Sequence, residues 1–279
     1  MPQDVEVFPI IDVPGSEADY GPAASNGVDA GPIVETRHRT LMLWAAAREA
    51  EAHRNQALAR RFRPLIDIEH VTLRGTLDSR LVLLNEPGSD RARGYRLLRH
   101  RLFSSGDPRI VAVTSAHPGE GKTTCALNLA LAIAEDTMTR TLLLEANSAR
   151  PALGEVFDFA PSRSIVEKII RFTCLGPPYP VVSISGTRLH ASPLPDAPLE
   201  GRLDRTLFGA ALSELREAYD YIVIDAASVL ESGDVDVVGE RSDAVIVAVR
   251  AGRSSKRDLR SAIAQLAPAP VLGSVLIDA

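Results

Sequence analysis

The stretch Thr114-Ser115-Ala116-His117-Pro118-Gly119-Glu120-Gly121-Lys122-Thr123-Thr124 decides the fold of this chain. It follows the apolar run Ile110–Val113, which predicts a buried strand, and it precedes Cys125–Ala134, whose small and apolar residues predict a helix. A glycine-containing loop between a strand and a helix is the context that a phosphate-binding loop requires. The sequence therefore predicts that this loop binds phosphate groups.

The residue types of the loop fit the chemistry of a nucleotide. Gly119 and Gly121 permit a curled backbone whose N–H groups cradle phosphate oxygens, and the start of the following helix adds positive charge. Lys122 reaches the terminal phosphates, and the Thr123 hydroxyl is placed to ligate Mg²⁺. We expect ATP to be held by Pro118, Gly119, Glu120, Gly121, Lys122, Thr123 and Thr124.

The alternative is an ordinary strand-to-helix turn that carries a lysine by chance. Composition disfavours it, because the chain has three lysines (Lys122, Lys168 and Lys256) and one of them stands where the motif requires it. One departure from the motif is visible, since Ala116 replaces its first glycine.

The length of 279 residues and a hydrophobic content of 45% allow one catalytic domain with an appendage. Apolar runs alternate with helical patterns after the loop, which is typical of a mostly parallel sheet with helices on both faces. The expected fold class is therefore an α/β P-loop NTPase. The expected strands are 110–113, 141–144, 181–184, 189–192, 221–224, 244–249 and 271–277, and the expected helices are 91–102, 125–134, 165–172, 203–218, 235–240 and 256–266.

The composition before residue 81 differs from that of the nucleotide domain, which we expect at 81–279. Residues 1–36 hold seven acidic residues and no Lys or Arg, which predicts a disordered acidic tail. Residues 37–80 are interpreted as a basic helical extension and linker. The helical pattern at 37–63 is compatible with a helix that binds a membrane or a partner, and also with an ordinary packed helix.

Targeting signals and metal motifs are absent from the sequence. No segment approaches the ~20 apolar residues that span a bilayer, and the acidic stretch Met1–Ile11 lacks the apolar core of a signal peptide. Cys125 and Cys174 match no metal-ligand spacing and indicate no disulfide framework. The net charge of −5 gives no reason to expect a nucleic-acid partner. We expect a cytoplasmic protein.

Two further strands end in polar residues. Ile222–Asp225 is an apolar strand that ends in a carboxylate, which at the carboxyl edge of a parallel sheet can hold Mg²⁺ directly or through water. The strand at 142–144 leads into Glu145 and Asn147. An alternative interpretation of Glu145 and Asn147 is that they are ordinary polar residues at the solvent-exposed end of a strand.

These three motifs, in this order, resemble those of the bacterial tyrosine kinases (BY-kinases) of capsule and exopolysaccharide export. That family carries a Ser-x-x-Pro-Gly-Glu-Gly-Lys-Ser/Thr loop, then Asp-x-Asp-x-x-Arg-Pro, then Asp-Thr-Pro-Pro. The segment Ser115–Thr123 matches the first motif closely. The resemblance covers residues 81–277 and includes Tyr95–Arg99, which is similar to the Arg-x-x-Arg helix that the family uses in subunit contacts.

The chain departs from the family pattern at several places. Glu145 and Asn147 stand where the family has two aspartates, and Ala226–Ser228 replaces Thr-Pro-Pro. Arg93 stands where the family's subunit-contact motif has a glutamate, and no tyrosine-rich segment precedes Ala279. The departures bear on the kinase step more than on nucleotide binding.

The resemblance implies an ATP-dependent tyrosine kinase, or a kinase-like ATPase, that regulates surface polysaccharide synthesis or export. Lys122, Glu145 and Asp225 would be its catalytic residues, with Glu145 orienting or deprotonating the incoming hydroxyl. Thr123, Asp225 and Glu145 would hold Mg²⁺, and Asn147 would line the ATP site.

The implied partner is a membrane polysaccharide copolymerase that acts in trans and recruits the protein to the inner face of the membrane. The resemblance is also compatible with a homo-oligomer. Arg96, Arg99 and the basic stretch 37–63 are the expected contact surfaces, although solvated faces would show the same pattern.

Two other functions remain compatible with the motifs. One is an ATP-operated switch like the septum-site and partition ATPases, which carry a second lysine where this chain has His117. The other is a scaffold that binds ATP without turnover. The fold is the same in every case and does not distinguish them.

Overall fold

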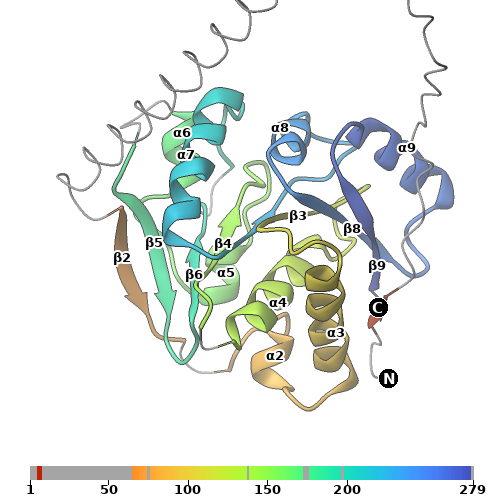
Figure 1. Cartoon of the computed structure of the whole chain (residues 1–279), viewed down its shortest axis with the longest axis horizontal. Helices are drawn as coiled ribbons and strands as arrows, with labels where there is room; N and C mark the ends of the chain where they lie inside the picture. The colour runs from red at the N-terminus through yellow and green to blue at the C-terminus, as the bar shows by residue number, and fades with distance from the viewer. Residues whose placement is uncertain are drawn as a thin grey trace, which may run out of the picture. The chain divides into compact units, whose positions relative to one another are not determined.

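The computed structural model describes residues 5–7, 65–73, 76–136, 138–171, 176–195 and 198–277. Within them, nine strands form one sheet in the order β1-β9-β8-β3-β7-β4-β6-β5-β2 (Figure 1). The strands are β1 (Val5–Val7), β2 (Ile66–Val71), β3 (Ile110–Ser115), β4 (Thr141–Glu145), β5 (Tyr179–Ile184), β6 (Leu189–Ser192), β7 (Tyr221–Asp225), β8 (Ala244–Arg250) and β9 (Val271–Ile277).

The central strands of the sheet are parallel, and each margin contains one antiparallel pair. Neighbouring strands are parallel from β9 through β8, β3, β7 and β4 to β6. At one margin β1 pairs antiparallel with β9, and at the other β5 pairs antiparallel with β6 and parallel with β2. The carboxyl ends of β3, β7, β4 and β8 therefore meet at one edge, where ligands of open α/β sheets bind.

Helices cover both faces of the sheet, and the alternation of residues along β3 shows why. Val111 and Val113 pack into one core with α2, α3, α4 and α5, whereas Ile110 and Ala112 pack into the other with α6, α7, α8 and α9 (Figure 1). A strand that is buried on both faces needs a continuous apolar run. The helices are α2 (Val82–Asn85), α3 (Asp90–Ser104), α4 (Lys122–Ala134), α5 (Leu153–Phe157), α6 (Ile165–Ile170), α7 (Arg205–Ala218), α8 (Asp234–Glu240) and α9 (Lys256–Leu266).

Capping residues set the starts of the longer helices. The Asp204 carboxylate accepts hydrogen bonds from the N–H groups of Thr206 and Leu207, so α7 begins at residue 205 and not at the expected 203. Gly121 is the N-cap residue of α4, which begins at Lys122, directly after the phosphate loop, so the helix extends three residues before the apolar run 125–134. Lys122 and Thr123 are thereby placed in the first turn of α4.

The predicted fold class is confirmed, and the structure adds to the expected elements. Both β1 and β2 belong to the sheet, although they precede the domain start expected at residue 81 and β1 falls within the expected disordered tail. The strand β2 escaped prediction because most of its side chains are partly or fully exposed, so it shows no apolar run. The helical pattern at 37–63 and most of the tail lie outside the described residues. No helix in the described part of the chain has the length and apolar character needed to cross a bilayer.

Candidate nucleotide-binding site

The loop between β3 and α4 has a backbone that only glycine adopts readily. Gly119 has a φ of 77° and Gly121 a φ of 90°, both in the left-handed region. A Cβ atom on Gly121 would also lie 2.7 Å from Cδ1 of Ile277 on β9. Both glycines of the predicted phosphate loop are therefore required by its geometry.

The loop presents free hydrogen-bond donors. The His117 N–H donates to the Glu120 carboxylate within the loop (2.8 Å). Among the described residues, the N–H groups of Gly119, Glu120 and Gly121 have no acceptor. Consecutive free N–H groups in a loop with left-handed glycines form a concave donor surface for an anion. The start of α4 adds its positive end at the same place.

Lys122 and Asp225 bring opposite charges into this site. Lys122 is 8% exposed and has no hydrogen bond or ion pair among the described residues, but its charge lowers the pKa of Asp225. Asp225 is 0% exposed, and neither of its carboxylate oxygens accepts a hydrogen bond. Burial raises the pKa of Asp225 more than Lys122 and the nearby Thr123 hydroxyl lower it.

The unpaired carboxylate of Asp225 is the test of whether the site fits Mg²⁺. A buried carboxylate without partners is costly, and a divalent cation removes that cost. Oxygen ligands from Asp225 and from the Thr123 hydroxyl are the kind that Mg²⁺ prefers. The donor set therefore fits the cation and the nucleotide that the sequence predicts.

Glu145 has a different environment although it lies on the strand next to Asp225. Its side chain is completely buried, and one carboxylate oxygen accepts the N–H groups of Ala152 (2.6 Å) and Leu153 (2.9 Å). The other oxygen accepts the Leu194 N–H at 2.7 Å. Glu145 thus ties the end of β4 to the start of α5 and to the segment after β6.

The pKa of Glu145 is raised to about 7. Burial is the main cause, and the charge of Asp225 adds to it, while the three backbone N–H donors act in the opposite direction. A carboxylate has about four acceptor sites, so one remains for a hydroxyl or a cation. The catalytic and metal-binding roles that the resemblance gives to Glu145 stay predictions.

Asn147 and Arg150 stabilise the loop after β4. Asn147 is 4% exposed, and its side-chain Nδ2 donates to the carbonyl oxygen of Arg150 at 2.7 Å. The side-chain amide of Asn147 therefore donates a hydrogen bond that an ionised aspartate at this position could not make. The role of Asn147 in ATP binding stays a prediction.

Arg96 and Arg99, the predicted contact residues, both reach Glu135 at the end of α4. Arg96 pairs with both carboxylate oxygens of Glu135, with Nε at 3.0 and 2.9 Å. Arg99 lies 3.6 Å from the same carboxylate and also donates to the carbonyl oxygen of Ala132. Within the described protein, this pair of arginines fastens α3 to α4, and a role in subunit contacts stays a prediction.

The turn after β8 also contacts the phosphate loop, and sequence reasoning missed it. The Ser254 hydroxyl donates a hydrogen bond to the carboxylate of Glu120. Arg250 Nη1 donates a hydrogen bond to the carbonyl oxygen of Gly119 at 3.2 Å. His117 lies 3.5 Å from Asp258 in the first turn of α9. No sequence signal marks these partners, because they lie more than a hundred residues from the loop.

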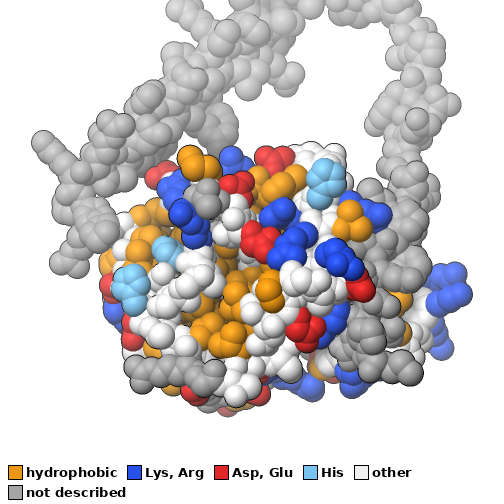
Figure 2. All heavy atoms as spheres, turned by 90° about the horizontal axis from the view of Figure 1, so that it is seen from below, with side chains coloured by type: hydrophobic (Ala, Val, Ile, Leu, Met, Phe, Trp, Pro, Cys, Tyr) orange, Lys and Arg blue, Asp and Glu red, His pale blue; other side chains and the backbone are white. Residues whose placement is uncertain are grey.

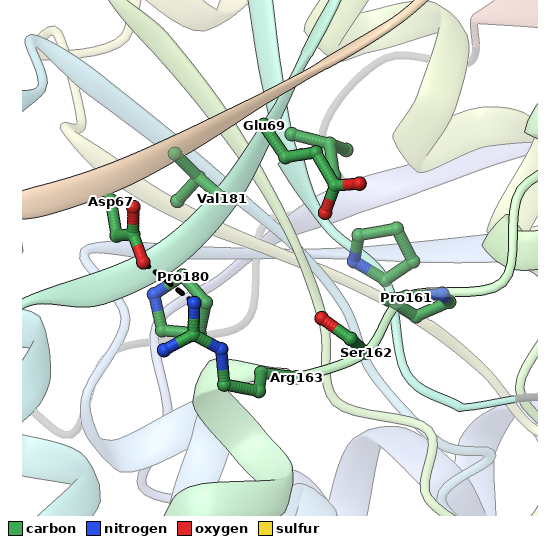
Figure 3. A pocket seen from close by; sticks show the side chains of 9 residues that line it. Asp67, Glu69, Pro161, Ser162, Arg163, Pro180 and Val181 are labelled. Carbon is green, nitrogen blue, oxygen red and sulfur yellow. Dashed lines mark hydrogen bonds and ion pairs between the residues drawn. The ribbon is translucent and has the colours of Figure 1, made fainter.

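A separate hollow lies at the β2 margin of the sheet (Figure 3). Asp67 pairs with Arg163 beside it, and Glu69 and Ser162 also line it. Its volume of about 40 Å³ is far too small for a nucleotide. It does not compete with the phosphate loop as the ATP site.

Comparison with known proteins agrees with the motifs. No family model matches the chain. The tyrosine-protein kinase YwqD of Bacillus subtilis is 26% identical over 205 residues, which cover 70% of this chain and 84% of YwqD. The tyrosine-protein kinase CpsD of Streptococcus pneumoniae is 29% identical, over 62% of this chain and 76% of CpsD. The chain is thus similar in sequence to bacterial tyrosine-protein kinases.

Three further proteins extend the comparison. The succinoglycan biosynthesis transport protein ExoP of Rhizobium meliloti is 27% identical, but the chain spans 26% of its length. The VpsO kinase domain superposes with a TM-score of 0.55 at 26% identity, covering 66% of this chain and 93% of that domain. The kinase domain of Escherichia coli ETK superposes with a TM-score of 0.60 at 18% identity, covering 78% of this chain and 85% of that domain, which supports the fold alone.

Proposed function

We propose that this protein binds Mg²⁺-ATP in its phosphate loop and acts as a tyrosine-kinase-like P-loop ATPase in surface polysaccharide synthesis or export. The observation that carries the ATP site is the buried, unpaired carboxylate of Asp225 beside Lys122 and the free N–H groups of the loop. The polysaccharide context rests on the relatives, among them a succinoglycan biosynthesis transport protein.

The residues of the site divide the work that phosphoryl transfer requires, which is positioning and charge neutralisation. Lys122 would neutralise the terminal phosphates together with the N–H groups of the loop. Thr123 and Asp225 would hold the cation, which, when bound, supplies positive charge against the phosphate oxygens. The near-complete burial of Lys122 and Asp225 strengthens each of these interactions because water is excluded.

In this proposal Glu145 activates the tyrosine hydroxyl that accepts the phosphoryl group. A tyrosine hydroxyl has a pKa of about 10 and needs a base at neutral pH. A carboxylate with a pKa of about 7 is suited to that task. In this proposal the remaining acceptor site of Glu145 orients or deprotonates the hydroxyl.

A second function, ATP binding or hydrolysis without transfer to tyrosine, is favoured by one observation. Glu145 already accepts three backbone hydrogen bonds and stabilises the start of α5. In this alternative Glu145 is a structural residue, and water or no acceptor takes the place of the hydroxyl.

The proposed partner is a membrane polysaccharide copolymerase that acts in trans and recruits the protein to the inner face of the membrane. Its support is the resemblance to kinases of polysaccharide export, together with the half-buried arginines of α3 as a candidate contact surface. Self-association through the same helix is part of the proposal.

Labelled ATP separates these functions. The purified protein is incubated with Mg²⁺ and γ-labelled ATP, with Lys122→Ala as the control. Label on tyrosine supports the kinase, label in free phosphate supports the ATPase switch, and bound label without turnover supports the scaffold. Nucleotide binding and turnover by Lys122→Ala at the wild-type level, with the fold intact, would remove the assignment of the phosphate loop.

A further inference from the structure

The turn that links β8 to α9 is fastened to the phosphate loop at two points. Arg250 at its start donates to the Gly119 carbonyl oxygen (3.2 Å), and Ser254 near its end donates to the buried carboxylate of Glu120. The Arg250 N–H also donates to the Ser254 hydroxyl, which closes the turn upon itself. The residues between these points are therefore held in place next to the loop.

Arg253 lies within this turn, and its guanidinium rests against Gly119. An ideal Cβ atom on Gly119 would lie 3.0 Å from Nη1, 3.1 Å from Cζ and 3.2 Å from Nη2 of Arg253. Because the three distances are nearly equal, the face of the guanidinium lies against the loop at Gly119. The absence of a side chain at Gly119 is what permits this approach.

The Arg253 side chain has no partner of its own. Among the described residues it makes no hydrogen bond and no ion pair, in contrast to Arg250. It is exposed to solvent, so it contributes no packing to either core. A cation that is held beside a set of free N–H donors without an anionic partner is suited to an anion that binds between them.

We propose that Arg253 is a nucleotide-binding residue that donates hydrogen bonds to the phosphate groups of the nucleotide in the phosphate loop. It adds a second side-chain cation to Lys122 and approaches the loop from the β8 side, at Gly119. The inference rests on the proposed ATP site and extends it to a residue outside the motif. The planar fork of arginine matches phosphate oxygens, which a lysine at this place would not reproduce.

The test measures ligand affinity and not the rate of turnover. The affinities of the full-length protein for Mg²⁺-ATP and for inorganic tripolyphosphate are determined by calorimetry. The variants are Arg253→Gln, the charge-conserving Arg253→Lys, and Arg257→Gln. The last is a matched control, because Arg257 is an exposed arginine of α9 close in sequence, and its loss changes the net charge equally.

We expect Arg253→Gln to weaken both ligands about tenfold or more, since a charge-assisted hydrogen bond is lost. Arg253→Lys should fall between Arg253→Gln and wild type, and Arg257→Gln should stay within about twofold of wild type because exposed charges are screened. The melting temperature should be unchanged in each variant, since neither replaced side chain has an internal partner among the described residues.

The contradicting outcomes are distinct. Equal affinities for Arg253→Gln and wild type overturn the inference alone. Weakened ATP binding with unchanged tripolyphosphate binding also overturns it, because Arg253 would then contact the base or the ribose. If the wild type binds neither ligand, the proposed ATP site fails together with this inference.

Discussion

Glu145 and Asp225 are register partners at the carboxyl ends of the adjacent parallel strands β4 and β7, and both side chains are completely buried. They differ in what they bind. Glu145 accepts three backbone N–H groups, whereas Asp225 accepts none. One carboxylate is thus part of the fold, and the other is open to a cation.

Asp225→Asn should stabilise the metal-free protein while it removes the response to Mg²⁺. The substitution replaces a buried charge that has no hydrogen bond, and we expect the free energy of unfolding to rise by about 1 kcal/mol or more. Urea unfolding with and without Mg²⁺-ADP measures both effects.

The matched control for this variant is Asp220→Asn. Asp220, directly before the first residue of the same strand, is paired with Arg140 at 3.2 Å and is partly exposed, so its loss should cost less than about 1 kcal/mol. A clear loss of stability in metal-free Asp225→Asn would show that the carboxylate already has a structural role.

Glu145 should make the metal-free protein less stable as the pH rises from about 4.5 to about 7. Its pKa is raised in the folded state, so the folded protein holds a proton over this range that the unfolded chain has released, and stability falls with pH. The shift corresponds to a change on the order of 3 kcal/mol. Urea unfolding between pH 4.5 and 8 gives the slope.

Glu145→Gln should reduce this slope, because glutamine does not titrate, while the raised pKa of Asp225 still contributes to it. Asp225→Asn should move the midpoint of the fall to lower pH, since the charge of Asp225 contributes to the raised pKa of Glu145. An unchanged slope in Glu145→Gln would mean that the carboxylate is ionised in the folded protein throughout this range.

Asn147→Asp tests whether the missing carboxylate of the middle motif limits the site. If residue 147 faces the nucleotide, the added charge should tighten the dependence of turnover on Mg²⁺. The variant also loses the hydrogen bond to the Arg150 carbonyl, so we expect a destabilisation of about 1 kcal/mol. Thermal unfolding and Mg²⁺ titration of turnover separate the two effects. Lower turnover at saturating Mg²⁺ would show that the neutral amide suits this site.

Arg96→Glu with Arg99→Glu should reduce self-association or binding to the membrane partner, while Mg²⁺-ATP binding is unchanged. The same variant also places three acidic side chains together at Glu135, so it should be less stable than wild type. Light scattering and pull-down measure assembly, and thermal unfolding measures the loss of the contact between α3 and α4.

Two further variants separate these effects. Glu135→Gln removes the ion pairs of both arginines, which keep their hydrogen bonds to backbone carbonyl oxygens, and it should preserve or increase assembly. Adding Glu135→Arg to the double reversal restores opposite charges between α3 and α4, so stability should recover to within about 1 kcal/mol of wild type but assembly should not. Assemblies identical to wild type in the double reversal would exclude the helix as an interaction surface.

The sequence by itself determined the central part of the fold. The apolar run at 110–113 predicted a buried strand, and the glycines at 119 and 121 predicted a curled backbone before the helix, and the structure has both. The positions of Lys122, Thr123 and Asp225 followed, because parallel strands bring their carboxyl ends to one edge. These features depend on local pattern and on the geometry of a parallel sheet.

Tertiary structure alone decided which groups bind one another. The sequence predicted that Glu145 acts on the incoming hydroxyl and on Mg²⁺, but it did not indicate that Glu145 also accepts the backbone N–H groups of residues 152, 153 and 194. Arg253 belongs to no motif and reaches Gly119 only because β8 lies beside β3 and the turn after it is fastened to Glu120. Such contacts join segments that are distant in the chain, and their geometry is set by the packing of the whole sheet, which no local pattern of residues encodes.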